Sequence, residues 1–170
     1  MAKVEGGYLR VNENCETSAP DVYAIGDVAA MVGGEGEVIK TGHVDAARKM
    51  AAHVAGELTS EGGGSGYAET PYFYSSAMGL DLGWKLYGKC GEGCTIVTIG
   101  LTGWEAAEKA SDVVWAAFYV DSDNVIVGVL LNNGTDEMKA KLPAVVEAKA
   151  VVISTKKVRQ IGVRRFLAPF

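Results

Sequence analysis

Hydrophobic residues recur every three or four positions between Val44 and Leu58, which is the spacing of one face of an α-helix. Thr41 is a suitable N-cap, and Asp45 stands four residues before Lys49, a favourable pair on one helical face. We therefore expect a helix over residues 44–58. The face that we expect it to bury consists of Val44, Ala47, Ala51, Val54, Ala55 and Leu58.

Two short segments that are predicted to be strands precede this helix. Residues 8–11 and 22–25 are each four residues long, and the second is bounded by Pro20 and Gly26. A compact apolar run between such punctuating residues is typical of a buried strand. A glycine-rich loop at residues 33–37 follows, so the first part of the chain is predicted to be a strand–loop–helix piece.

Beyond residue 67 the pattern changes to short runs of β-branched and aromatic residues. The polar run at 121–124 separates two of them and predicts a hairpin, while Thr135 is expected to cap a helix in which Pro143 kinks the chain or starts a second turn. The result is an antiparallel sheet followed by a helix. The predicted strands are 72–75, 82–87, 94–99, 113–120 and 125–131.

The fold class is therefore α+β, with a candidate domain boundary in the glycine-rich segment 61–66. We expect residues 1–60 to be the end of an α/β domain and residues 67–150 to be a sheet-plus-helix domain. Residues 151–170 hold five cations and no acid, and are expected to be a basic tail, mostly solvated. Its Phe166, Leu167 and Phe170 indicate that part of it docks.

Composition excludes several classes of protein. With 48% hydrophobic and 22% charged residues the chain is not disordered, and no apolar run reaches the roughly 20 residues of a membrane span. A net charge of −5 argues against a nucleic-acid binder, and three cysteines are too few for a disulfide-stapled secreted domain. We expect the cytoplasm, with an organelle as the alternative because a targeting segment of a longer protein would precede Met1.

The stretch from Thr17 to Ala29, T-S-A-P-D-V-Y-A-I-G-D-V-A, carries the most chemical information. Gly26 allows a close backbone approach, and Asp27 offers a carboxylate at a strand end, where α/β sheets bind ligands. A lone Gly-Asp is more often a turn. However, the stretch resembles the second flavin-binding motif of the FAD-containing, NAD(P)H-dependent pyridine nucleotide-disulfide oxidoreductases, in which the aspartate binds the ribityl chain of FAD. The resemblance implies that role for Asp27.

Within that superfamily the chain looks like monodehydroascorbate reductase. The segments that carry this resemblance are H-V-D-A-A-R at 43–48, P-Y-F-Y-S at 71–75 and L-G-W-K-L-Y-G at 82–88. It extends from residue 6 to about residue 140. In two places the chain departs from the family pattern, which has Glu where Gly42 stands and Arg where Ser76 stands. An insertion at 77–79 also separates the two aromatic segments.

The resemblance implies a set of cofactor-binding residues. Gly26 and Asp27 would contact FAD, and His43, Val44 and Asp45 would present the start of the following helix to the pyrimidine edge of the flavin. A helix N-terminus suits this edge, because its free N–H groups and positive dipole end stabilise negative charge on a reduced flavin.

The same resemblance assigns substrate binding to Arg48 and Tyr74. The implied partner is the ascorbyl radical, whose negative charge suits a guanidinium group and a phenol hydroxyl. On their residue types alone, Arg48 reads as a solvated helix residue and Tyr74 as sheet packing. No residue is assigned to acid–base catalysis.

The chain lacks the G-x-G-x-x-G fingerprints that a flavin and a nicotinamide cofactor require. The glycines at 33–36, 62–66 and 91–93 all fail this spacing. The sequence therefore looks like the C-terminal part of such a reductase, without its NAD(P)H-binding domain, and we expect the isolated chain to be inactive. A fragment of a ferredoxin or quinone reductase, or a non-catalytic scaffold protein, remains the alternative.

Other candidate sites have weaker support in the sequence. His43 and His53 stand ten residues apart with no histidine or cysteine nearby, so no metal site is expected. Cys90 and Cys94 form a C-x-x-x-C sequence rather than the C-x-x-C of redox dithiols. A turn is the favoured interpretation, with a disulfide as the alternative.

Overall fold

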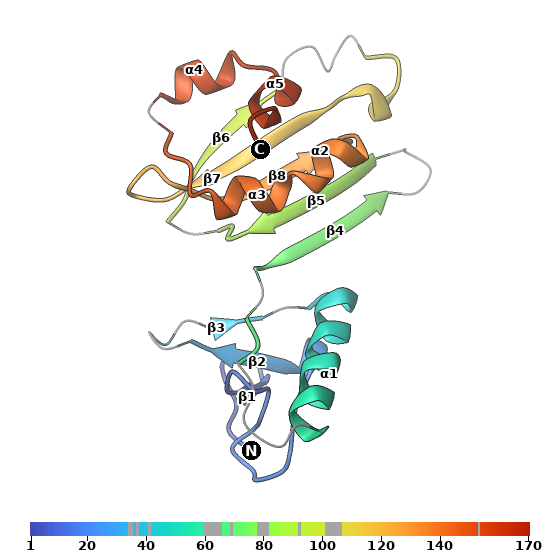
Figure 1. Ribbon diagram of the computed structural model, residues 1–170, viewed down its shortest axis with the longest axis vertical. Coiled ribbons are helices and arrows are strands. Elements are labelled where there is room, and N and C mark those ends of the chain that lie inside the picture. Colours follow the sequence, from blue (N-terminus) through green and yellow to red (C-terminus); the bar gives the residue numbers. More distant parts are fainter. Residues whose placement is uncertain are drawn as a thin grey trace. The chain divides into compact units, whose positions relative to one another are not determined.

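The computed structural model describes residues 1–33, 36, 38–40, 42–59, 66–68, 70–77, 82–91, 93–100, 107–152 and 154–170. The chain divides into two compact units, Met1–Glu69 and Thr70–Phe170, and each is described by itself (Figure 1). Of the linker predicted at 61–66, only Gly66 lies among the described residues.

The first unit contains a small three-stranded sheet and one long helix. The sheet has the order β1-β2-β3, in which β1 (Leu9–Val11) runs parallel to β2 (Ala29–Val32) and β3 (Val38–Ile39) runs antiparallel to it. The helix α1 (Val44–Thr59) confirms the predicted helix. Its Met50 is buried with side chains of the strands and of the intervening turns: Val11, Cys15, Ala24 and Ala29.

The strand predicted at residues 22–25 is wrong. This segment forms only an isolated bridge between Tyr23 and Glu16, and Val22 and Ile25 are 39% and 36% exposed. The buried strand is β2, which begins after the 3-10 turn η1 (Gly26–Val28). A strand must pair along its length, and only β2 finds a continuous partner in β1.

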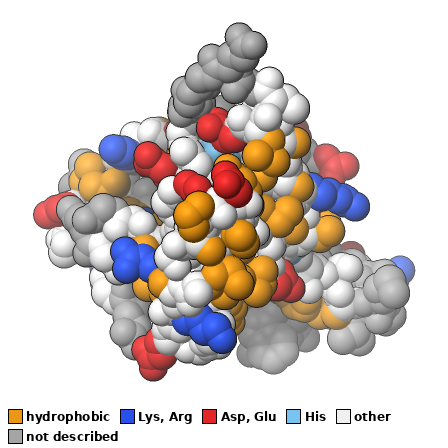
Figure 2. Space-filling model, turned by 90° about the horizontal axis from the view of Figure 1, so that it is seen from below, with side chains coloured by type: hydrophobic (Ala, Val, Ile, Leu, Met, Phe, Trp, Pro, Cys, Tyr) orange, Lys and Arg blue, Asp and Glu red, His pale blue; other side chains and the backbone are white. Residues whose placement is uncertain are grey.

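The apolar face predicted for α1 is also partly wrong. The helix buries Ala46 and Met50, whereas Val44 and Leu58 are 49% and 64% exposed. Viewed from below Figure 1, the surface carries a band of hydrophobic side chains (Figure 2). The helix therefore has a second apolar face besides the one that packs in this unit, which is why its periodicity alone did not identify the buried face.

The second unit is a five-stranded, fully antiparallel sheet, as the sequence predicted, and the structure adds its strand order, β4-β5-β8-β7-β6. A hairpin joins β7 to β8, and the carboxylate of Asp121 accepts hydrogen bonds from the backbone N–H groups of Asp123 and Val125 in its turn. The strands are β4 (Tyr72–Ala77), β5 (Leu82–Gly88), β6 (Thr95–Ile99), β7 (Trp115–Val120) and β8 (Ile126–Asn132).

The helices of this unit pack on one face of the sheet (Figure 1). They are α2 (Asp136–Ala140), α3 (Leu142–Glu147), α4 (Thr155–Arg159) and α5 (Val163–Leu167), while the 3-10 turn η3 (Ala110–Asp112) precedes β7 in the chain. The hydroxyl of Thr135 accepts a hydrogen bond from the backbone N–H of Met138 at 3.3 Å, which confirms the predicted cap. Pro143 lies in the first turn of α3 and so begins a second helix.

Residues 151–170 are not a solvated tail. Val163 and Leu167 are 5% and 1% exposed, and the ring of Phe166 lies 4.4 Å from that of Phe118, centroid to centroid. The hydrophobic residues of this segment complete the core, while Arg164 and Arg165 stay exposed. Its positive charge obscured this because charged and apolar residues alternate around a short amphipathic helix.

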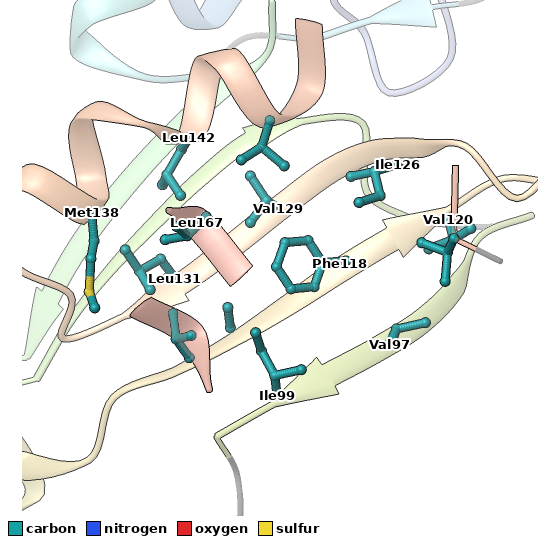
Figure 3. Packing of buried hydrophobic residues seen from close by; sticks show 14 residues of the cluster. Val97, Ile99, Phe118, Val120, Ile126, Val129, Leu131, Met138, Leu142 and Leu167 are labelled. Atoms are coloured by element: carbon teal, nitrogen blue, oxygen red, sulfur yellow. The ribbon is translucent and has the colours of Figure 1, made fainter. Parts of the chain in front are cut away.

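Phe118 lies at the centre of the core of the second unit (Figure 3). It is fully buried on β7, and both the neighbouring strands and the helices contribute to its cluster. The other members are Val97, Ile99, Ala116, Val120, Ile126, Val129, Leu131, Met138, Leu142, Val145, Val152, Val163 and Leu167.

Replacing Phe118 with alanine is expected to lower the free energy of unfolding of the second unit by about 3–5 kcal/mol, because it removes a buried ring and leaves a cavity. Urea unfolding followed by tryptophan fluorescence measures this, since all three tryptophans lie beyond residue 70. The control is Phe73→Ala, whose ring is 45% exposed. Equal losses for both variants would contradict the assignment of Phe118 to the core.

Candidate functional site

Gly26 occupies a position that only glycine fits well. Its φ of +68° lies in the left-handed region, and a Cβ built on it would lie 3.1 Å from the Cβ of Ala47. Ala47 is in the first turns of α1. The missing side chain therefore lets the η1 turn lie directly against the start of the helix.

Asp27, the next residue, is exposed and faces the segment that leads into α1. A Cβ built on Gly42 would lie 3.8 Å from Oδ1 of Asp27, so this carboxylate lies close to the N-terminal end of the helix. A carboxylate and a row of helix N–H groups at one place can accept and donate hydrogen bonds to the same polar ligand.

His43 caps the helix. Its Nδ1 accepts a hydrogen bond of 3.4 Å from the backbone N–H of Asp45, and its carbonyl accepts one of 3.0 Å from that of Ala47. This geometry makes His43 an N-cap through an imidazole nitrogen, with Nε2 then carrying the proton. Thr41, the cap expected from the sequence, lies outside the described residues.

Arg48 projects from the next turn of α1. Its guanidinium group lies 3.6 Å from Oδ1 of Asp45, and its side chain is 76% exposed. An ion pair this exposed contributes little to stability. Arg48 can therefore exchange Asp45 for another anion at small energetic cost.

Tyr74 belongs to β4 in the second unit and is 42% exposed. The centre of its ring lies 5.8 Å from that of Tyr72. Its cross-strand partner is Lys85 of β5, and the ammonium group of Lys85 lies 5.4 Å from the centre of the Tyr72 ring. Tyr87 continues the row, 4.8 Å from Tyr72. The hairpin thus carries aromatic rings and one cation on a single face.

Lys85 is the residue that the sequence analysis missed. In an antiparallel pair, residues directly opposite share a face. Aligning the aromatic run 72–77 against 82–88 as a hairpin would have placed Lys85 opposite Tyr74 and diagonally from Ser76. The cation thus lies next to the position at which the sequence lacks the expected arginine.

The structure brings five of the predicted site residues together: Gly26, Asp27, His43, Val44 and Asp45. Arg48 follows one turn further along the same helix. Tyr74 belongs to the other unit and is described there.

Comparison with known proteins first identifies the class. Residues 1–57 match the profile of the pyridine nucleotide-disulphide oxidoreductases. Residues 70–166, more than half of the chain, match the profile described as monodehydroascorbate reductase 3-like, C-terminal domain. The chain belongs to this monodehydroascorbate reductase family, as the sequence motifs indicated.

Individual proteins that resemble this chain carry the name of the same family. The chain is 34% identical over 158 residues to monodehydroascorbate reductase 5 of Oryza sativa subsp. japonica, covering 88% of this chain and 29% of the relative. With monodehydroascorbate reductase of Solanum lycopersicum it shares 36% identity over 138 residues, covering 78% and 30%. The chain thus spans about a third of the length of the relatives that it matches.

Solved structures support the fold. The structure of Fdr9 aligns with a TM-score of 0.73 at 25% identity, covering 96% of this chain and 39% of that one. A complex of putidaredoxin reductase with putidaredoxin aligns with a TM-score of 0.67 at 21% identity, covering 95% and 36%, a likeness of fold alone. Among the described residues, no helix combines the length and hydropathy needed to cross a bilayer.

Gly26→Ala is expected to destabilise the first unit by about 1–2 kcal/mol, since a left-handed backbone disfavours any Cβ. The close approach of Ala47 adds to this loss. The control is Gly56→Ala, inside α1 with open space around it. That change should stabilise the helix by up to about 1 kcal/mol.

Urea unfolding followed by circular dichroism at the helix band compares the two variants. If Gly26→Ala were as stable as the unaltered chain, the close packing of η1 against α1 would be contradicted.

Proposed function

We propose that this chain is the C-terminal part of an FAD-dependent NAD(P)H oxidoreductase that reduces the ascorbyl radical. The observation that carries the proposal is that the carboxylate of Asp27 lies close to the N-terminal end of α1, which His43 caps. The chain that holds this arrangement belongs to the monodehydroascorbate reductase family. The residues present fit the edge of a flavin. Asp27 offers acceptor oxygens to ribityl hydroxyls and Gly26 permits close approach, while the first turn of α1 offers a pyrimidine carbonyl those N–H groups that do not donate to His43.

In the complete enzyme, bound FAD would supply the redox chemistry that couples oxidation of NAD(P)H to one-electron reduction of the radical. The protein supplies position and charge. The N–H groups after His43 and the positive end of the helix dipole stabilise negative charge at the flavin edge. Asp45 lies in this first turn, and its pairing with Arg48 offsets its own negative charge there.

For the substrate, the proposal assigns binding roles to Arg48 and Tyr74 and adds Lys85. A guanidinium group, a phenol hydroxyl and an ammonium group are the donors that an anionic oxygen ligand requires. Arg48 is exposed and only weakly paired, and Lys85 lies opposite Tyr74. We assign to Lys85 the positive charge that is missing at Ser76.

The residues of this chain include no nicotinamide fingerprint, so NAD(P)H would bind a part of the enzyme not represented in them. We therefore propose that the 170 residues alone catalyse no turnover. A ferredoxin reductase is the second candidate, supported by the fold of the putidaredoxin reductase complex. We propose the cytoplasm as the compartment, with an organelle as the alternative because two rice relatives are named as chloroplastic and peroxisomal.

The native polypeptide that carries these residues is expected to contain bound FAD and to oxidise NAD(P)H when ascorbyl radical is generated. Purification from source cells with an antibody against residues 70–166, followed by an absorption spectrum and a radical-dependent assay, tests this. A ferredoxin in place of the radical tests the second candidate. Micromolar FAD binding with NADH-driven turnover by the isolated 170 residues would contradict the proposal that this part of the enzyme is inactive alone.

In that complete enzyme, Lys85→Met is expected to raise KM for the ascorbyl radical about tenfold, the effect of losing one charge-assisted contact. The rate of flavin reduction by NAD(P)H should not change. The matched control is Lys139→Met, which removes a half-buried lysine of α2 paired with Asp136. An unchanged KM for Lys85→Met would remove Lys85 from the substrate site.

A further inference from the structure

The second unit holds a cavity of about 440 Å³ where the end of α5 lies beside the junction of α2 and α3. A cavity of this volume is in the range that small-molecule sites occupy. The lining residues are Glu137, Met138, Lys141, Arg164, Leu167 and Ala168. None of them is assigned to the flavin or the ascorbyl radical above, so a ligand bound here is independent of the proposed reductase activity.

The most deeply buried residues of the lining are apolar. Met138 of α2 and Leu167 of α5 are 9% and 1% exposed, and both belong to the buried cluster of the unit (Figure 3). Water against such side chains lacks hydrogen-bond partners, so an apolar group displaces it favourably. The inner part of the cavity therefore suits the apolar body of a ligand.

Lys141 fixes one wall of the cavity. Its ammonium group donates hydrogen bonds of 3.3 and 3.5 Å to the carbonyls of Leu167 and Ala168, the last residue and the C-cap of α5. The last carbonyls of a helix lack partners within the helix and form its negative end, where a cation is stabilised. Lys141 thus holds the end of α5 to the junction of α2 and α3, and the cavity lies between connected elements.

Arg164 supplies a positive charge at the rim of the cavity. It precedes Leu167 and Ala168 by three and four residues, so all three lie on one side of α5. Its side chain is exposed, and the ion pairs found among the described residues do not include it. A guanidinium group presents its N–H donors in a fork that matches the two oxygens of a carboxylate.

Glu137 is the acid among the lining residues. Its carboxylate lies 4.0 Å from the ammonium group of Lys141, and its side chain is 78% exposed, so water screens it. Two cations and one acid leave the lining with one surplus positive charge. The surplus lies with Arg164, because the segment 151–170 that contains it holds five cations and no acid.

We propose that this cavity binds a small amphipathic carboxylate, a single carboxylate group on an unbranched apolar body. The carboxylate pairs with the guanidinium group of Arg164, and the apolar body lies against Met138 and Leu167. A phosphate dianion fits less well, because the ammonium group of Lys141 already donates to two carbonyls. Since the lining comes from α2 on one side and α5 on the other, the bound ligand joins these helices and stabilises the unit.

Titration of the isotope-labelled full chain with octanoate, followed by two-dimensional amide NMR, tests the proposal. We expect saturable shifts for the amides of Met138, Lys141, Leu167 and Ala168, which line the cavity. Octylammonium has the same apolar chain with the opposite charge, and acetate has the charge without the chain. Each should bind at least about tenfold more weakly than octanoate. The proposal is overturned if either binds as tightly as octanoate, or if octanoate gives no saturable shift of these amides.

Arg164→Met is expected to weaken octanoate binding about tenfold, the effect of losing one charge-assisted contact. The matched control is Arg165→Met, which removes the neighbouring exposed arginine outside the lining and should leave the affinity unchanged. Equal weakening by the two variants would indicate a general effect of charge and contradict the role of Arg164.

Ala168→Trp keeps every charge and places a large ring in the cavity. Ala168 is exposed and has a φ of −58°, so the backbone accepts this side chain without strain. We expect the variant to lose saturable octanoate binding while the amide signals of β6 and β7 stay in place. Undiminished binding by this variant would place the octanoate site elsewhere and overturn the proposal.

Discussion

The close approach of Gly26 to Ala47 is the constraint on which the first unit depends. Because no side chain separates the η1 turn from α1, the carboxylate of Asp27 and the N-terminal end of the helix meet at one point. The flavin site that we propose here needs both groups together, an acceptor for hydroxyls and a positive dipole end for negative charge. The absence of a Cβ at Gly26 therefore allows the close packing of this unit and also brings these two groups together.

Sequence patterns predicted those features that rest on local chemistry. The helix over Val44–Thr59 and the antiparallel sheet of the second unit follow from periodicity, and the cap at Thr135 follows from its hydroxyl. The strand at residues 22–25 was wrong because an apolar run shows only that a segment can form a strand. Whether the run forms a strand depends on a neighbouring strand with which it can pair. Here β1 pairs with Ala29–Val32 instead.

The candidate site, like the fold, could be predicted from the sequence only in part. A motif located Asp27 and the start of α1, and the structure added why they meet. Lys85 was missed because only the register of the paired strands sets it opposite Tyr74. The docking of residues 151–170 was underestimated for a related reason. Net charge describes the exposed side of a short helix, whereas Val163 and Leu167 on its other side determine where it packs.

The position of α5 in the core has a consequence for biosynthesis. Leu167 is buried in one cluster with Val97 and Phe118, side chains of strands that leave the ribosome about 50–70 residues earlier. Until residue 167 has emerged, these strands expose the surface that α5 will cover. The second unit therefore cannot complete its folding until α5 has left the ribosome, and until then its sheet exposes apolar surface that can aggregate.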